Sequence, residues 1–319
     1  MKILVTGCAG FIGYSLTKKL LDETKSKIIG IDNINNYYSI KLKNHRLKNL
    51  KKNNKFKFYK KDINDYVFLN RLFKREKIKY VIHLAAQAGV RESRINPKKF
   101  LESNIKGFFN VIEISRIHKV KHFIFASSSS VYGNQKKFPI NEKTKTNPVS
   151  FYGATKVSNE KMAIAYSNIY KLPTTALRFF TLYGPYGRPD MALFSFADSI
   201  SKNKKIFIYN NGNHSRDFTY IDDAVEMVYK LIAKIPKDKI PYQCFNIASG
   251  KPIKLNKFVK LIELNLNKKA KVSYLSLQPG DVVTTHASVR AINKSIKTKK
   301  ITNIEEGICN FIRWYKKYY

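Results

Sequence analysis

Short apolar runs alternate with longer amphipathic segments along the first half of the chain. The runs are rich in β-branched and aromatic residues and predict strands at residues 3–6, 27–32, 56–59, 80–84, 123–127 and 174–178. The segments between them include predicted helices at residues 11–21, 65–76 and 104–118. Strands that are apolar on both faces and alternate with helices indicate an α/β protein with a Rossmann-type, doubly wound parallel sheet.

The pattern of short apolar runs breaks up near residue 180. Turn-rich segments at residues 183–189 and 210–213 separate short elements in the second half of the chain. We therefore predict two domains. Residues 1–180 form the sheet domain, to which some later segments return, and residues 181–319 form a smaller, mixed C-terminal domain.

The length and the cysteines narrow the class of protein. A chain of 319 residues can bury a large α/β core. Cys8, Cys244 and Cys309 form no C-x-x-C pair and no disulfide framework, which favours a reducing cytosol. The chain begins with a strand pattern rather than a signal peptide, and no apolar run is long enough to span a bilayer. We therefore expect a soluble, cytoplasmic protein without a membrane partner.

The charge of the chain is strongly positive. Lysine and arginine number 60 against 22 aspartate and glutamate residues, which gives a formal net charge of +38. Such a charge can indicate a nucleic-acid or anionic-membrane ligand. Here lysine far outnumbers arginine and the lysines are spread along the chain, which is typical of a general lysine bias. We expect no specific nucleic-acid partner, although a diffuse positive field would help to attract an anionic substrate.

A glycine pattern directly follows the first predicted strand. Gly7 permits a tight turn, Gly10 lets backbone N–H groups approach a pyrophosphate, and Gly13 allows the next helix to pack closely on the strand. The N-terminus of that helix then faces the phosphates. Asp32 ends the second strand, where a carboxylate accepts hydrogen bonds from a ribose diol and repels a 2′-phosphate. The pattern predicts a site for NAD rather than NADP in the first domain.

Other residues at the carboxyl ends of the predicted strands complete the cofactor site. Asp62 and Ile63 end the third strand, where an adenine edge would lie, and small residues after the fourth strand let the cofactor pass. The full set predicted to contact NAD is Gly7, Gly10, Phe11, Ile12, Gly13, Asp32, Asn33, Asp62, Ile63, Leu84, Ala85, Ala86, Gln87, Asn104, Ser127, Tyr152, Lys156 and Phe179. No metal is expected.

Tyr152 and Lys156 are the candidate catalytic pair. Residues four apart on a helix share one face. A free phenol has a pKa of roughly 10, which is too high for a base at neutral pH, and a nearby ammonium together with the nicotinamide cation favours the phenolate. Four serines at residues 127–130 follow the fifth strand, at the edge where open parallel sheets bind ligands. Together with the glycine pattern, these residues predict a nicotinamide enzyme that removes a proton from a hydroxyl group.

Six segments carry a family resemblance that runs nearly the full length of the chain. They lie at residues 5–13, 30–33, 83–91, 127–133, 183–192 and 215–223. With them the chain resembles the extended short-chain dehydrogenase/reductase family and, within it, the NAD-dependent nucleotide-sugar epimerases, most closely the UDP-glucuronate 4-epimerases. The glycine and Tyr/Lys motifs indicate only the superfamily. The runs GRPDMA at residues 187–192 and QAGVR at residues 87–91 are much more specific to the glucuronate epimerases.

The resemblance implies the catalytic roles. Tyr152 would be the proton acceptor, Lys156 would lower its pKa, and Ser128 would hydrogen-bond the 4-hydroxyl of the sugar. At the next two positions related dehydratases carry an Asp-Glu pair, and related decarboxylases carry a Glu at the second. Here both are serine, Ser129 and Ser130, so elimination chemistry lacks its acid. Neutral hydroxyls would also accommodate a carboxylate that a glutamate would repel.

The resemblance also implies a substrate site. Arg188 is the expected partner of the sugar C5 carboxylate, with Thr181 nearby, and Arg91 either joins that end of the site or closes its loop. Arg216 is expected on the diphosphate and Asp281 on the uridine ribose. The full set predicted to contact substrate is Arg91, Ser128, Ser129, Ser130, Thr181, Arg188, Met191, Ala192, Tyr209, Arg216 and Asp281.

The predicted reaction is NAD-dependent 4-epimerisation of UDP-glucuronate to UDP-galacturonate through a 4-keto intermediate. One alternative is a neutral UDP-hexose 4-epimerase, acting on UDP-glucose and UDP-galactose, in which Arg188 is structural. A nucleotide-sugar decarboxylase is less consistent, because its acid is missing. A non-catalytic NAD-sensing or nucleic-acid-binding relative is a further alternative, against which Tyr152 and Lys156 argue. The resemblance further implies a homodimer, built from helices at residues 104–118 and 154–169.

Overall fold

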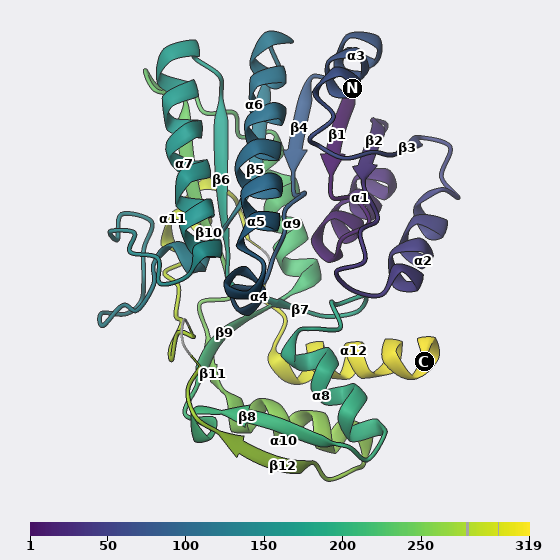
Figure 1. Cartoon of the computed structure of the whole chain (residues 1–319), viewed down its shortest axis with the longest axis vertical. Coiled ribbons are helices and arrows are strands. Elements are labelled where there is room, and N and C mark those ends of the chain that lie inside the picture. Colours follow the sequence, from purple (N-terminus) through teal and green to yellow (C-terminus); the bar gives the residue numbers. More distant parts are fainter. Residues whose placement is uncertain (279–280, 299) are drawn as a thin grey trace.

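In the computed structural model, which describes residues 1–278, 281–298 and 300–319, seven parallel strands form the central sheet (Figure 1). The strands are β1 (Lys2–Thr6), β2 (Lys27–Asp32), β3 (Phe56–Lys60), β4 (Tyr80–His83), β5 (His122–Ser128), β6 (Thr174–Phe179) and β10 (Tyr242–Ile247). Their order is β10-β6-β5-β4-β1-β2-β3. Six of them match the predicted strands, and the chain order reverses between β1 and β4. The predicted Rossmann-type, doubly wound fold is therefore confirmed.

Helices cover both faces of the sheet (Figure 1). Ile3 and Val5 of β1 share one hydrophobic core with the first helix, whereas Leu4 between them packs into a second core on the other face. Both faces are buried, as the uninterrupted apolar runs indicate. The helices of the first 180 residues are α1 (Phe11–Glu23), α2 (Ile40–Leu50), α3 (Tyr66–Glu76), α4 (Val90–Ile95), α5 (Pro97–Phe100), α6 (Gly107–Ile117) and α7 (Phe151–Tyr170), with a π-helix η1 (Leu101–Lys106) and a 3₁₀ turn η2 (Ser129–Val131).

The helix predicted at residues 104–118 is only partly α-helical. Its first residues belong to η1, and α6 begins at Gly107. The side chain of Asn104 accepts a hydrogen bond from the backbone N–H of Gln87 (2.8 Å) and donates one to the Gln87 carbonyl oxygen (3.0 Å). The carbonyl oxygen of Asn104 accepts a hydrogen bond from Nδ2 of Asn159 (2.6 Å). These contacts with distant residues stabilise the wider turn, and hydrophobic periodicity does not reveal them.

The second half of the chain returns to the sheet and also forms a smaller layered part below it (Figure 1). β10 pairs with β6, and the ninth α-helix packs against α1. The other strands form a three-stranded sheet, β11-β9-β7, and a two-stranded sheet, β12-β8. The elements are β7 (Thr181–Tyr183), α8 (Ala192–Ser201), β8 (Lys205–Tyr209), η3 (Asn210–Gly212), β9 (Ser215–Tyr220), α9 (Ile221–Ile232), β11 (Pro252–Lys254), α10 (Leu255–Leu266), β12 (Lys271–Leu275), α11 (Arg290–Ser295) and α12 (Ile304–Tyr318).

This arrangement places the carboxyl ends of β1 and β4 toward the smaller part (Figure 1). Ligands of open parallel sheets bind beyond these ends, where the strand order reverses. Within the described ranges, the chain has no helix with the length and apolar character needed to cross a membrane.

Candidate active site

The glycine turn after β1 forms part of a cleft at the carboxyl ends of the strands. Gly7 has a φ of +71°, and a Cβ added there would lie 2.8 Å from the backbone nitrogen of Ala85. A Cβ on Gly13 would lie 2.0 Å from the carbonyl oxygen of Gly7. Because neither position has room for a side chain, the turn and α1 pack closely. Gly10 caps α1 and lines the cleft, so the helix begins at the ligand space.

Asp32, at the end of β2, is tied to this turn. Its carboxylate accepts hydrogen bonds from the backbone N–H groups of Ala9 (3.0 Å) and Ile34 (2.9 Å). Burial raises the pKa of the Asp32 carboxyl, while the Ile34 hydrogen bond and the charge of Lys43 oppose the rise. The turn suited to a pyrophosphate and the acid suited to a ribose are therefore held at a fixed separation.

Most of the predicted cofactor residues line this one cleft. They are Gly7, Gly10, Phe11, Ile12, Gly13, Asp32, Asn33, Ile63, Leu84, Ala85, Ala86, Gln87, Ser127, Tyr152, Lys156 and Phe179. Asp62 and Asn104 do not belong to the lining that the described residues form. Asp62 accepts a hydrogen bond from Nδ2 of Asn33 (2.7 Å), and Asn104 holds the backbone of Gln87. Asp62 and Asn104 therefore hold two residues that line the cleft, Asn33 and Gln87.

Several residues that line the cleft were not predicted from the sequence. Asn35, Tyr37, Tyr38 and Lys43 come from α2 and the irregular segment before it. Nζ of Lys43 donates hydrogen bonds to the carbonyl oxygen (2.7 Å) and to Oδ1 (2.8 Å) of Asn35. This segment shows no strand or helix period and adjoins a lysine-rich stretch, so no sequence pattern distinguishes these side chains.

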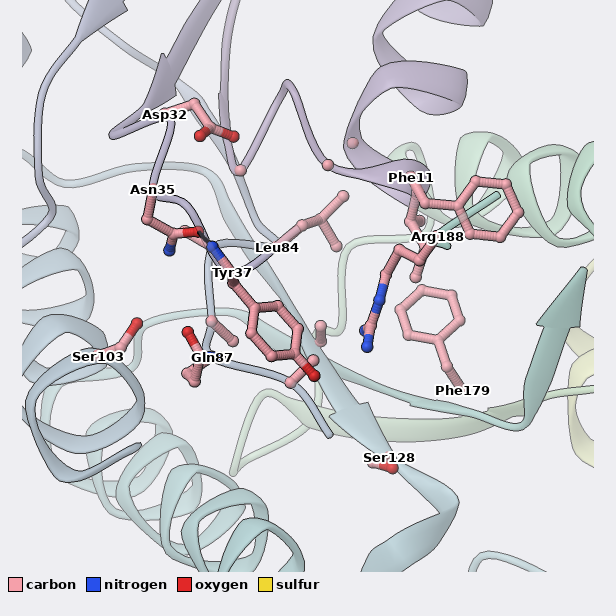
Figure 2. A pocket seen from close by; sticks show the side chains of 18 of the residues that line it. Phe11, Asp32, Asn35, Tyr37, Leu84, Gln87, Ser103, Ser128, Phe179 and Arg188 are labelled. Atoms are coloured by element: carbon pink, nitrogen blue, oxygen red, sulfur yellow. Dashed lines mark hydrogen bonds between the residues drawn. The ribbon is translucent and has the colours of Figure 1, made fainter. Parts of the chain in front are cut away.

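Gln87 tests whether the cleft fits a cofactor. The residue is only 6 % exposed, and its Nε2 has no hydrogen-bond partner among the described residues. Burying an amide group without a partner is costly, and Figure 2 shows the side chain at the cleft. A free buried donor beside a glycine turn that excludes side chains fits a polar dinucleotide such as NAD.

Tyr152 and Lys156 lie in the first turns of α7. The helix begins after Ser150, whose Oγ accepts a hydrogen bond from the N–H of Gly153 (3.1 Å). Nζ of Lys156 lies 5.9 Å from the centre of the Tyr152 ring and donates a hydrogen bond to the carbonyl oxygen of Ala126 (2.9 Å). The structure therefore brings the phenol and the ammonium into the cleft together.

The surroundings of Tyr152 act on its pKa in opposite directions. Burial raises the pKa of this phenol, while a hydrogen bond with Ser128 and the charge of Arg188 act in the opposite direction. Burial also lowers the pKa of Lys156 to about 8, against the charge of Glu160. The prediction counted the charges of the ammonium and of the nicotinamide and not the burial of both side chains, which only the fold reveals.

The four serines divide between two environments. Ser127 and Ser128 end β5 and line the cleft, whereas Ser129 and Ser130 belong to η2. The hydroxyl of Ser128 donates to Oγ of Ser130 and accepts from the N–H of Ser130, both at 3.1 Å. Ser130 therefore orients Ser128, and Ser128 is the serine that lowers the pKa of the candidate base, Tyr152.

A buried ion pair between Arg178 and Glu160 contacts the first of these serines, Ser127. Nε and Nη2 of Arg178 donate to the two carboxylate oxygens of Glu160 (2.9 and 2.7 Å), and the side chains are 7 % and 5 % exposed. Glu160 also accepts a hydrogen bond from Oγ of Ser127 (2.5 Å). Because the charge of Glu160 raises the pKa of Lys156, the ion pair acts on a candidate catalytic residue. This ion pair was not predicted from the sequence.

Four predicted substrate residues gather on the side of the smaller part. Arg188 and Met191 line the main cleft, and together with Thr181 and Ala192 they line an adjoining pocket. Figure 2 shows the Arg188 side chain extending into the cleft near Phe179. The cation that was predicted to meet a sugar carboxylate therefore lies in the same space as Ser128.

The remaining predicted substrate residues form a second group. Nη2 of Arg91 contacts Oδ2 of Asp281 at 2.8 Å, and the Arg91 guanidinium lies 4.0 Å from the centre of the Tyr209 ring. Burial lowers the pKa of Arg216 to about 10, with Asp281 and Arg91 as its charged neighbours. Arg91 therefore groups with the residues expected at the nucleotide, and its contact with Asp281 joins α4 to the smaller part.

The sequence matches a known family model over most of its length. Residues 3–248 match the NAD dependent epimerase/dehydratase family. The chain belongs to this family. The protein CapI of Staphylococcus aureus is 46 % identical to it over 100 % of this chain and 99 % of the relative. A UDP-glucuronate 4-epimerase of Thermodesulfobacterium geofontis is 40 % identical over 98 % of this chain and 96 % of the relative.

Similarity to solved structures supports the same relationship. A crystal structure of UDP-glucuronic acid 4-epimerase from Bacillus cereus, in complex with UDP-glucuronic acid and NAD, superposes with a TM-score of 0.94. The two sequences are 31 % identical, and the match covers 100 % of both chains. The predicted membership among NAD-dependent nucleotide-sugar epimerases of the extended short-chain dehydrogenase/reductase type is thus confirmed.

Proposed function

We propose that this protein is an NAD-dependent 4-epimerase that interconverts UDP-glucuronate and UDP-galacturonate. The observation that carries the proposal is that Tyr152, Ser128, Lys156 and Arg188 line one cleft. A phenol and a hydroxyl suit proton removal from a sugar hydroxyl, and a guanidinium suits a sugar carboxylate. The activities of the Thermodesulfobacterium and Bacillus relatives support the same substrate.

Tyr152 is the proposed base. As a phenolate it accepts the proton of the sugar 4-hydroxyl, and Ser128 hydrogen-bonds the same hydroxyl and orients it. Lys156, fixed by the Ala126 carbonyl, supplies a positive charge that favours the phenolate over the buried neutral phenol. Bound NAD supplies reversible hydride transfer at C4. After the keto sugar has turned, Tyr152 would return its proton to O4 as C4 regains hydride on its other face, which completes the inversion.

Arg188 is the proposed partner of the C5 carboxylate. The 4-keto form of the sugar is a β-keto acid. It loses CO2 when the bond between C5 and the carboxylate carbon aligns with the π system of the C4 carbonyl. A guanidinium that holds the carboxylate near the plane of the ring keeps that bond misaligned. Ser129 and Ser130 supply no acid for elimination. These side chains together favour epimerisation over loss of water or CO2.

The group of Arg91, Tyr209, Arg216 and Asp281 is the proposed binding site for the nucleotide end. Two guanidinium groups suit a diphosphate, and a carboxylate suits a ribose diol. The keto sugar can then turn about a fixed diphosphate and present its other face. In this proposal residues 1–180 mainly bind NAD, and residues 181–319 mainly bind the UDP-sugar.

We also propose a homodimer. α6 and α7 pack against each other and carry exposed apolar residues, including Phe109 and Ile117 on α6 and Ile169 and Tyr170 on α7. Exposed apolar patches of this kind are typical of interfaces. Sedimentation should give a dimer for the wild type and a monomer for Phe109→Asp combined with Ile169→Asp. A monomeric wild type would contradict this part of the proposal.

A cytoplasmic location is part of the proposal. Cys8, Cys244 and Cys309 are free thiols in the structure. Free thiols persist in a reducing compartment, which supports this location. Activity confined to the cytosolic fraction of the source cells is the expected result, and activity in a secreted fraction would refute it.

Product analysis of Arg188→Ala tests the proposed reaction. The variant should bind UDP-glucuronate more weakly and convert part of it to a UDP-pentose and CO2, because the carboxylate is no longer held. Arg71→Ala, which changes an exposed arginine on α3, is the control and should behave as the wild type. An Arg188→Ala variant with unchanged kinetics and no pentose product would show that Arg188 does not hold the carboxylate.

A further inference from the structure

The guanidinium of Arg188 has two edges with different surroundings. Nε donates to Oδ1 of Asp190 (3.0 Å), and Nη2 donates to Oδ2 of the same carboxylate. In the described part of the chain, no protein acceptor contacts Nη1. Asp190 therefore occupies the Nε edge and leaves the edge between the two Nη atoms for a ligand. Since Arg188 extends into the cleft, that free edge is available to a substrate (Figure 2).

Asp190 is itself held by a residue from the sheet domain. The hydroxyl of Tyr37 donates to Oδ2 of Asp190 (3.2 Å), and the Arg188 guanidinium lies 5.6 Å from the centre of the Tyr37 ring. Gly89 gives this tyrosine room, because a Cβ there would lie 2.5 Å from the Tyr37 hydroxyl. Asp190 belongs to the GRPDMA run and Gly89 to the QAGVR run, the two runs that are most specific to the glucuronate epimerases. Tyr37 lies beside both residues.

The backbone before Arg188 is fixed separately. Arg46 of α2 is fully buried and donates from Nη2 to the carbonyl oxygens of Tyr186 (2.6 Å) and Gly187 (3.3 Å). Its Nη1 donates to the carbonyl oxygen of Ala9 in the glycine turn (2.8 Å). One guanidinium thus joins the cofactor turn to the loop that carries Arg188. With the backbone held in this way, the orientation of the Arg188 side chain depends on Asp190.

We propose that Asp190 is a positioning residue that makes the cleft specific for a uronic acid, with Tyr37 holding Asp190 in place. This inference rests on the proposed function, because it assigns the C5 carboxylate to the free Nη edge of Arg188. A carboxylate can make a two-point contact with that edge. A neutral hexose has no carboxylate and cannot make this two-point contact. Asp190 therefore acts on the choice of sugar.

A competing role for Asp190 has the opposite consequence. If its carboxylate only filled the place of the substrate carboxylate, its removal would free Arg188 and tighten the binding of a uronic acid. Positioning is favoured because Asp190 contacts one edge and leaves the other open. The loss of Asp190 then lets the arginine side chain adopt other rotamers and weakens binding.

The test is titration calorimetry of NAD-loaded protein with UDP-glucuronate and with UDP, which shares the nucleotide but has no uronic acid. All variants carry Tyr152→Phe, which prevents turnover during the titration. Asp190→Asn should weaken UDP-glucuronate binding about tenfold and UDP binding less than about twofold, since a charge-assisted contact is lost. Tyr37→Phe should act in the same direction by about two- to threefold, because one hydrogen bond is removed.

The matched control is Asp22→Asn, which changes an exposed aspartate that pairs with Lys18 on α1. It should leave both dissociation constants unchanged. Tighter UDP-glucuronate binding to Asp190→Asn would overturn the proposal in favour of competition, and equal weakening of both ligands would overturn it in favour of a general structural role.

Turnover by the protein without Tyr152→Phe separates the two proposals. If the protein with Tyr152 intact epimerises UDP-glucuronate, while the Asp190→Asn variant binds UDP-glucuronate as tightly as its reference, only the role of Asp190 is wrong. If it neither binds nor epimerises UDP-glucuronate, the proposed function is wrong, and the role of Asp190 is refuted with it.

Discussion

Replacing Glu160 by glutamine should change both the stability of the protein and the pH range of its activity. The wild-type carboxylate accepts two hydrogen bonds from Arg178 and one from Ser127, in a site where both charged side chains are buried. Glutamine keeps the shape of the side chain and one acceptor oxygen but removes the charge. Arg178 would then remain as a buried cation bonded only to neutral groups.

The size of the stability loss follows from the burial of this pair. Removing one partner of a buried ion pair typically costs about 3–5 kcal/mol. Arg178 also donates to the Tyr132 hydroxyl (2.9 Å) and the Glu142 carbonyl oxygen (3.0 Å), and glutamine retains an acceptor. We therefore expect a loss near the lower limit, about 3 kcal/mol, seen as a lower denaturant midpoint. Glu305→Gln, which changes an exposed partner of Lys257, should lose less than about 1 kcal/mol.

The same substitution should shift the pH dependence of turnover. Burial lowers the pKa of Lys156 to about 8, and the negative charge of Glu160 opposes that fall. Without this charge the pKa of Lys156 falls further, so the ammonium that favours the phenolate is lost at a lower pH. The alkaline limb of the kcat profile should move toward neutrality in Glu160→Gln and stay in place in Glu305→Gln. A Glu160→Gln variant with wild-type stability and an unshifted profile would refute this reasoning.

Three further changes test other parts of the structure. Gly13→Val should abolish NAD retention, measured as NAD released on denaturation, because its Cβ would lie 2.0 Å from the Gly7 carbonyl oxygen. Burial raises the pKa of Glu76, but hydrogen bonds from two lysines lower this pKa overall to about 2. The stability that the Glu76 carboxylate gives to the fold is therefore present above pH 4.5 and is lost as the pH falls toward 2. Glu76→Gln should therefore flatten the acid-unfolding curve in that range. Arg46→Met should leave the Tyr186 and Ala9 carbonyls without a donor and cost about 1–3 kcal/mol in chemical denaturation; unchanged stability would contradict the contacts described for that guanidinium.

The parts of the fold that the sequence could predict are those with a short-range period. Buried parallel strands such as β1 are apolar on both faces, and the glycine turn that follows is recognisable because Gly7 and Gly13 have no room for a side chain. Tyr152 and Lys156 were likewise found through helical spacing and lie together in the cleft. Local pattern was sufficient wherever the determining contacts lie within a few residues.

The rest depends on contacts between distant residues. The π-helix at η1 is stabilised by hydrogen bonds between Asn104 and Gln87, and Tyr37 donates a hydrogen bond to Asp190 across 153 positions. The burial that raises the pKa of Tyr152 likewise depends on tertiary packing and not on spacing. Neither periodicity nor motif spacing contains this information, so the positioning residues of the site became visible only in the folded chain.

The most direct test of the proposed function is to incubate the purified protein with UDP-glucuronate, without added NAD, and to separate the nucleotide sugars. Appearance of UDP-galacturonate is the predicted result, and it would establish both the reaction and a retained cofactor. The contradicting result is UDP-glucuronate that remains unchanged even after NAD is added, while UDP-glucose is converted to UDP-galactose. Arg188 would then be structural, and the protein would be a neutral UDP-hexose 4-epimerase.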